Sequence, residues 1–183
     1  MTRMPLFFVA ALAVTTAQAD GVLVDKSEIR FVSKQMGVDV EGRFRKWAAD
    51  VVWQPNDVAK SKAIIDIDLA SIDLASEDSE NEVRGAVWFD TKKFPIAHFA
   101  STSIKDGGGG KFDVAGELSI KGVTKPIVVP VMLKKDAAGG SVAEGSFVVK
   151  RLDYKIGEGA WSDPDTVANE VTVRIRMALA PTK

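Results

Sequence analysis

The sequence predicts an all-β protein: a single antiparallel eight-stranded barrel with one short helical insertion. Apolar and polar residues alternate over eight separate segments, and short turn signals rather than further helices separate most of them. The chain has no cysteine, so disulfide bonds cannot stabilise it, and its stability depends on a packed interior. About eight strands is the number that closes a small barrel and leaves no sheet edge exposed.

Each predicted strand has an apolar side chain at every second position, which turns one face toward a core and the other toward solvent. The last strand shows this most clearly, because Val173 and Ile175 alternate with Arg174 and Arg176. Turn signals rich in glycine occur at 106–110, 122–124 and 138–140. The predicted strands span residues 28–32, 38–44, 62–69, 97–104, 111–121, 125–134, 146–152 and 171–179.

The helical insertion is predicted over residues 76–85, between the third and fourth predicted strands. Ser76 is a favourable N-cap, acidic residues follow in the first turn, where the helix dipole favours them, and Gly85 is a suitable end. Just upstream, the unit IDLAS occurs twice, at 67–71 and 72–76. A shift of five residues reverses the facing of a strand side chain, so we expect the first copy to end a strand and the second to lead into the helix.

Residues 1–19 have the pattern of a secretory signal peptide. Arg3 precedes an apolar run from Leu6 to Val14, and Ala17 and Ala19 form a small-residue cleavage site. The apolar run is too short to span a bilayer as a helix, and no later segment approaches the necessary length. We therefore expect residues 20–183 to form the mature domain, exported to the periplasm and not an integral membrane protein.

Acidic and basic residues are nearly balanced, with 25 Asp and Glu against 24 Lys and Arg. A protein that binds nucleic acid usually concentrates an excess of basic residues on one face, so this composition argues against a nucleic-acid partner. The absence of cysteine also excludes thiol catalysis, thiolate metal sites and disulfide exchange.

No constellation of residues typical of catalysis is visible. His98 is the only histidine, and its position next to Phe99 in a predicted strand indicates an outward side chain. The acidic residues at 77–82 and 163–165 lack the spacing of a calcium loop. The glycines at 107–110 precede neither a helix nor a Lys-Ser/Thr pair, so they do not indicate a phosphate site. The sequence therefore predicts a protein that is not an enzyme, with no catalytic residue and no metal site.

The interior of the barrel remains as the candidate site. A barrel of eight strands is at the size limit where side chains either fill the interior or leave room for one small ligand, and alternation alone leaves both outcomes open. Gly42, Ala63 and Gly116 are small members of the inward set that could leave space. The candidate lumen residues are Val38, Val40, Phe44, Ile65, Ile67, Phe99, Phe112, Val114, Leu118, Ile120, Phe147, Val149, Arg151, Val173, Ile175 and Met177.

Two features of this interior allow alternatives. Arg151 is the only charged residue that follows the inward alternation. It could meet a polar ligand head group or pair with an acid such as Asp153, and we favour the pairing. The tryptophans lie near strand ends, either as a rim of the lumen or as corners of the core, and we favour the corners. They are Trp47, Trp53, Trp88 and Trp161.

Several short motifs, in order along the chain, resemble YceI-like proteins. They are GRF at 42–44, IDLAS at 67–71, WFD at 88–90, FP at 94–95, Phe99, GELSIKGVTK at 116–125 and RLDY at 151–154. The WF pair at 88–89 and GAW at 159–161 are similar to the branch often found beside cytochrome b561 membrane proteins. Tyr154 and His98 depart from the residues usual in the family.

The resemblance implies an exported, mostly periplasmic, lipocalin-like barrel that binds an isoprenoid lipid, polyprenyl or quinone-type, in its lumen. It implies no cofactor other than such a bound lipid or quinone. A second hypothesis is a packed barrel without a carried ligand, which modulates a membrane partner such as a cytochrome b561. An enzyme that acts on a lipid is a third and weaker alternative. The volume of the lumen discriminates between the first two.

Overall fold

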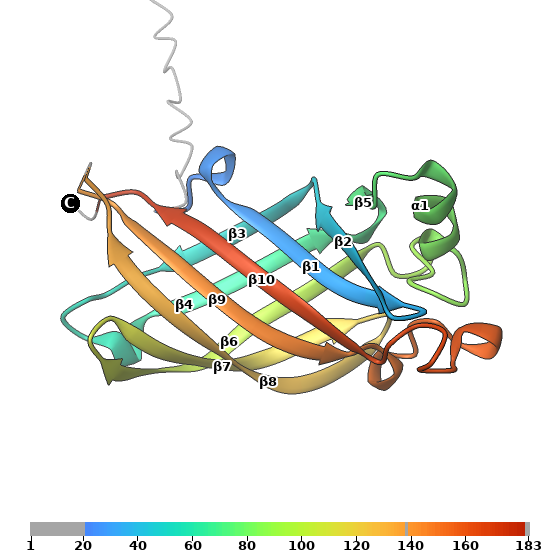
Figure 1. Ribbon diagram of the computed structural model, residues 1–183. Coiled ribbons are helices and arrows are strands. Elements are labelled where there is room, and N and C mark those ends of the chain that lie inside the picture. Colours follow the sequence, from blue (N-terminus) through green and yellow to red (C-terminus); the bar gives the residue numbers. More distant parts are fainter. Residues whose placement is uncertain (1–20, 138, 182–183) are drawn as a thin grey trace, which may run out of the picture.

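The computed structural model describes residues 21–137 and 139–181, and the predicted signal peptide at 1–19 lies outside the described residues. Within this part of the chain, ten strands form one antiparallel sheet that curls into a barrel, with α1 (Glu77–Arg84) at one end (Figure 1). The strands are β1 (Glu28–Gln35), β2 (Val38–Phe44), β3 (Trp47–Val52), β4 (Lys62–Asp68), β5 (Ile72–Asp73), β6 (Ile96–Gly108), β7 (Lys111–Ile120), β8 (Val123–Lys135), β9 (Ser141–Lys150) and β10 (Glu170–Leu179). The 3-10 helices are η1 (Val24–Lys26), η2 (Val58–Lys60), η3 (Leu69–Ser71), η4 (Arg151–Tyr154) and η5 (Gly159–Trp161).

The hydrogen-bonded order is β3-β4-β6-β7-β8-β9-β10-β1-β2-β5. The ten strands occupy eight positions around the barrel, because β2 and β3 are the halves of one bent strand and β4 and β5 are the halves of its partner. Trp47 of β3 pairs with Ile67 of β4, and Phe44 of β2 pairs with Ile72 of β5. The sheet thus closes on itself, and the prediction of an all-β barrel is confirmed.

The bend between β2 and β3 is held by main-chain hydrogen bonds to the last residue of β4 and to η3. The Arg45 N–H donates to the Ser71 carbonyl, and the Asp68 N–H donates to the Lys46 carbonyl, both at 3.0 Å. Sequence reasoning missed β3 and β5. The consecutive alanines of WAADVV blur the alternation of β3, and β5 has only two residues.

A carboxylate braces the same bend. Arg43 Nε donates to Asp73 Oδ2 at 2.8 Å, and Arg45 Nη2 lies 2.9 Å from Asp73 Oδ1. These hydrogen bonds, first from Arg43 and then from Arg45, favour the ionised form and lower the pKa of Asp73 to about 2. Asp73 of β5 thereby binds both to β2 and to the bend itself.

The helix α1 begins and ends as predicted. The Ser76 hydroxyl accepts a hydrogen bond from the Ser79 N–H, and the Gly85 N–H donates to the Glu82 carbonyl. Glu80 is buried and accepts from the Leu74 N–H at 3.2 Å and from Arg84 Nη2 at 2.9 Å. These bonds fix α1 against the chain that leaves β5, across one end of the barrel.

The inward glycines do not leave space, contrary to the expectation. Phe31 lies opposite Gly42 on the neighbouring strand, and a side-chain carbon added to Gly42 would overlap the Phe31 ring. The Phe99 ring covers Gly116 in the same way. Large rings on adjacent strands thus fill the room that the glycines free. Ala63, by contrast, does border an interior cavity.

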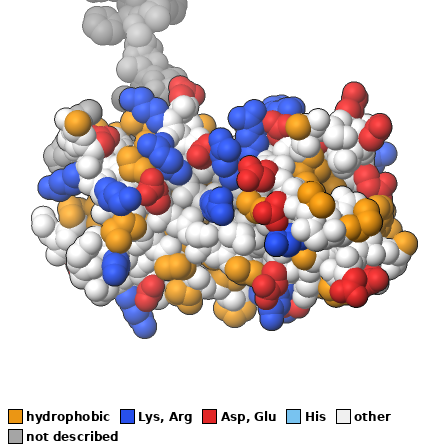
Figure 2. All heavy atoms as spheres, viewed as in Figure 1, with side chains coloured by type: hydrophobic (Ala, Val, Ile, Leu, Met, Phe, Trp, Pro, Cys, Tyr) orange, Lys and Arg blue, Asp and Glu red, His pale blue; other side chains and the backbone are white. Residues whose placement is uncertain are grey.

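The outer face of the barrel is charged with both signs. Over β1 and β10, Figure 2 shows Lys and Arg side chains interspersed with Asp and Glu. Arg30 Nε lies 2.8 Å from Glu28 Oε2, and Arg176 is next to Glu144. The charged residues therefore cover the outside, while the apolar half of each strand faces inward.

Candidate ligand-binding site

Two apolar cavities lie inside the barrel, with volumes of about 420 and 140 Å³. The larger, which we call the outer cavity, is bordered by α1 and by the loop that follows β9. The smaller, which we call the inner cavity, lies toward the opposite ends of the strands, where Trp53 and Leu179 are among the residues that border it. The outer cavity alone falls in the range of small-molecule sites, roughly 300–1,000 Å³.

Five side chains border both cavities, and we call them the girdle. They come from β1, β4, β7, β9 and β10, so they surround the lumen at one level. The two cavities thus adjoin at these shared side chains. The girdle residues are Ile29, Ile67, Leu118, Phe147 and Val173.

The structure places every predicted lumen residue except Val38 along the cavities. Ile67, Leu118, Phe147 and Val173 belong to the girdle; Val40, Phe44, Ile120, Val149 and Arg151 border the outer cavity; Ile65, Phe99, Phe112, Val114, Ile175 and Met177 border the inner cavity. That they contact a ligand stays a prediction.

Val38 has the inward parity but borders neither cavity, so its assignment to the lumen was wrong. Its side chain is 67% exposed. It follows the tight β1–β2 turn, where Met36 is also 73% exposed and Gly37 has a positive φ. The alternation of β2 is regular, but this end of the strand lies outside the ring of side chains that encloses the cavity.

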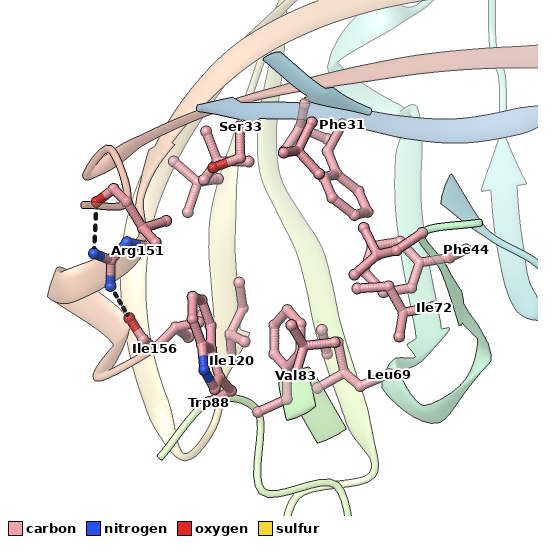
Figure 3. Close-up of a pocket in the computed structure, with 18 of the residues that line it drawn as sticks. Phe31, Ser33, Phe44, Leu69, Ile72, Val83, Trp88, Ile120, Arg151 and Ile156 are labelled. Carbon is pink, nitrogen blue, oxygen red and sulfur yellow. Dashed lines mark hydrogen bonds between the residues drawn. The ribbon is translucent and has the colours of Figure 1, made fainter. Parts of the chain in front are cut away.

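Sequence reasoning missed the residues that border the outer cavity from outside the long strands. Figure 3 shows Phe31 and Ser33 of β1 on one side of this cavity, with Leu69 and Val83 on the other. Val83 and the other helix and loop residues have no alternation of period two, so the strand pattern could not reveal them. Phe31 and Leu69 lie within predicted strands, but they were not among the predicted lumen residues. The missed apolar residues outside the eight predicted strands are Ile72, Leu74, Val83, Phe89, Ile156 and Val167.

Three of the four tryptophans border the lumen, at its two ends, and Trp47 borders neither cavity. Trp88 and Trp161 border the outer cavity with ring centroids 5.6 Å apart. Trp53 borders the inner cavity and meets Phe112 edge to face, with centroids 4.9 Å apart. Trp88 is also part of the buried core, so this residue both borders the lumen and packs in the core.

Arg151 is a buried anchor for the loop over the outer cavity, not a partner of an acid. Its side chain is 2% exposed, and its N–H groups donate to five main-chain carbonyls at 2.6–3.1 Å. The expected pairing with Asp153 is wrong, because Asp153 lies 3.4 Å from Lys125 instead. The accepting residues are Ile156, Gly157, Trp161, Val167 and Ala168.

The same anchor ends β9 two residues earlier than predicted. Arg151 and Leu152 belong to η4, because the chain turns there to wrap around the guanidinium. The guanidinium also lies 5.5 Å from the centroid of the Trp88 ring. Burial lowers the pKa of Arg151 below its ordinary value, yet a guanidinium stays protonated in proteins.

His98 lies on the outer face of the barrel, as predicted. Its side chain is 46% exposed, and Nδ1 lies 2.6 Å from Asp66 Oδ1 on the neighbouring strand β4. It borders neither interior cavity.

We expect His98→Gln to leave the stability and the bound ligand nearly unchanged. An exposed pair of this kind contributes about 0.2–1 kcal/mol, and glutamine can still donate to Asp66. A thermal melt and the lipid content of the purified variant check this expectation. A large loss of ligand from a folded variant would instead connect His98 to the site.

Among residues 21–137 and 139–181, no group of three or more His, Cys, Asp or Glu side chains is placed to hold a metal ion. The same residues include no helix with the length and apolar character that crossing a bilayer requires.

Sequence comparison relates the chain to one family along most of its length. The model of the YceI-like domain matches residues 22–179. A UPF0312 protein of Azotobacter vinelandii is 30% identical over 157 residues, which are 80% of this chain and 82% of the relative. A UPF0312 protein of Vibrio vulnificus is 35% identical over 104 residues, 56% of this chain and 55% of the relative. This match therefore spans about half the length of the curated relative.

Solved structures share the fold. BcnA of Burkholderia cenocepacia superimposes with a TM-score of 0.82 at 38% identity, over 86% of this chain and 98% of BcnA. A polyisoprenoid-binding domain of Saccharophagus degradans, implicated in plant cell wall breakdown, gives a TM-score of 0.70 at 18% identity, over 90% of this chain and 99% of that domain. At that identity the second likeness shows the fold alone.

Proposed function

The chain belongs to the YceI-like family, and we propose that it is an exported, periplasmic binding protein that holds an isoprenoid lipid, polyprenyl or quinone-type, in the lumen of its barrel. The observation that carries this proposal is the lumen itself. Two apolar cavities lie inside the barrel, and they share the five side chains of the girdle. A long, flexible hydrocarbon suits such a space better than a compact polar molecule does.

The energetics support an apolar ligand. A buried methylene contributes about 0.8 kcal/mol, so an isoprene unit contributes roughly 4 kcal/mol before the cost of ordering the chain. A few units are then sufficient for tight binding, and shape rather than hydrogen bonding selects the tail. The polyisoprenoid-binding domain of Saccharophagus degradans, which has the same fold, is consistent with this choice.

The alternative of a packed barrel that only modulates a membrane partner depends on a filled interior. The outer cavity of about 420 Å³ is large enough for a ligand, and it favours carriage over that alternative. A partner such as a cytochrome b561 remains compatible with carriage.

We expect protein purified gently from its native host to release an isoprenoid lipid on organic extraction. The lumen should retain such a lipid because its apolar surface would otherwise face water. Mass spectrometry of the extract identifies the lipid, with the flow-through of the same column as the control. Extracts that contain no isoprenoid, from protein that also fails to bind geranylgeraniol, would contradict the proposal.

A further inference from the structure

The polar residues of the lumen are all at one end. Side chains around the inner cavity are apolar or aromatic, whereas the outer cavity also meets six polar residues. An amphiphilic ligand would therefore place its head group in the outer cavity and its tail toward the girdle. The polar residues are Ser33, Gln35, Asp78, Ser79, Glu82 and Arg151.

Two of these residues, the half-buried Ser33 and the exposed Gln35, have side-chain polar groups that a head group could meet. Figure 3 shows the Ser33 side chain directed from β1 into the cavity. Within the described chain, neither the Ser33 hydroxyl nor the Gln35 amide has a hydrogen-bond partner in the protein. Arg151 cannot serve in this way, because a guanidinium has five N–H donors and five carbonyls already accept from it.

The charges around the outer cavity disfavour an anionic head group. Asp78 and Glu82 border the cavity from α1, and Glu82 Oε1 accepts from Trp161 Nε1 at 3.0 Å. The Ser76 hydroxyl caps the Ser79 N–H of α1, and the acidic residues Asp78 and Glu80 in its first turn repel a phosphate there. The positive charge of Arg151 attracts anions, but it lies behind Trp88 and is surrounded by carbonyl oxygens.

We infer that the ligand has an uncharged, hydrogen-bonding head group, such as a quinone carbonyl or an alcohol, which binds at Ser33 and Gln35. This inference rests on the proposed function and narrows it. Lipids with the same isoprenoid tail but a phosphate head group bind more weakly, because they meet the two carboxylates and find no free N–H on Arg151.

Four probes that share the same hydrocarbon tail and differ in their head group test the inference on delipidated protein. They are geranylgeraniol, a naphthoquinone with the geranylgeranyl tail, geranylgeranyl phosphate, and the hydrocarbon of the same skeleton. Quenching of tryptophan fluorescence reports the quinone, because Trp88 and Trp161 border the outer cavity, and competition against it gives the other affinities. We expect the alcohol and the quinone to bind about tenfold more tightly than the phosphate at low salt, with a smaller difference at high salt.

Two sets of variants connect these affinities to the residues. Ser33→Ala should weaken the alcohol and the quinone by roughly 3- to 10-fold, the usual effect of one lost hydrogen bond, and leave the hydrocarbon unchanged. The double variant Asp78→Asn/Glu82→Gln should strengthen the phosphate by about tenfold while changing the alcohol little. Ser146→Ala, on the exposed face of β9, is the matched control and should change none of them.

The outcomes separate the inference from the proposed function. If the phosphate binds as tightly as the alcohol, or if Ser33→Ala weakens the hydrocarbon as much as the alcohol, the head-group inference is overturned while carriage stands. If the hydrocarbon, the alcohol, the quinone and the phosphate all fail to bind folded protein, the proposed function fails and the inference with it.

Discussion

Replacement of Arg151 by methionine is expected to lower the free energy of unfolding by about 3–5 kcal/mol, the range for disruption of a buried polar network. Methionine fills a similar volume but donates no hydrogen bond. The carbonyls of Ile156, Gly157, Trp161 and Val167 would then be left without their donor inside the protein. Each unsatisfied buried carbonyl costs about 1–3 kcal/mol, and rearrangement of the loop offsets part of the sum.

Chemical denaturation with urea measures this loss, and two further variants sharpen it. Arg151→Lys keeps the charge but has only three donors on a compact group, so we expect it to recover less than half of the loss. Arg174→Met makes the same substitution on the exposed face of β10, where the described chain offers Arg174 no ion pair, and it should cost less than about 0.5 kcal/mol. Equal effects at Arg151 and Arg174 would contradict the anchoring role of Arg151.

Introduction of a carboxylate into the inner cavity, by Val114→Glu, is expected to abolish lipid retention. Val114 lies opposite Val129 on β8, and both border this cavity. A carboxyl group there has no hydrogen-bond partner among the apolar side chains and would draw in water or stay protonated. We expect a loss of about 1–3 kcal/mol in stability, with the barrel still folded, because the cavities offer the longer side chain some room.

Val128→Glu is the matched control for this variant. Val128 is on β8, 56% exposed on the outer face of the sheet, so the same substitution there should keep both the fold and the lipid. Lipid recovered per mole of folded protein, measured by mass spectrometry, compares the two. A folded Val114→Glu variant with a full complement of lipid would show that the ligand does not reach the inner cavity.

The sequence predicted the inner faces of the strands well, because alternation directly encodes which side of a sheet a residue faces. Phe112, Val114, Leu118 and Ile120 of β7 all border the lumen for this reason. Alternation does not encode where the lumen ends, so it could not exclude Val38, which has the correct parity but lies beyond the rim.

Two other features could not be predicted from the alternation of a strand, each for its own physical reason. Arg151 donates to main-chain carbonyls, which every residue has. The identity of the side chains therefore could not predict which residues accept these hydrogen bonds. The space beside Gly42 depends on a ring from the neighbouring strand, and the register that brings Phe31 there is a tertiary property. The pattern of a single strand thus predicts which side chains point inward. The volume of the interior and the buried polar contacts depend on how different strands and loops come together.

The pairing of β1 with β10 also has a consequence for the time course of folding. Glu28 lies opposite Arg176 and Phe31 opposite Val173, so contacts that seal the barrel join segments from the two ends of the domain. Such distant contacts form slowly, because a long loop must be ordered before they are made. Hairpins such as β7–β8 can form early, whereas one edge of β1 stays unpaired until β10 is in place. The last pairing to form therefore also encloses the lumen, and a lipid that arrives before that step meets an open trough rather than a sealed barrel.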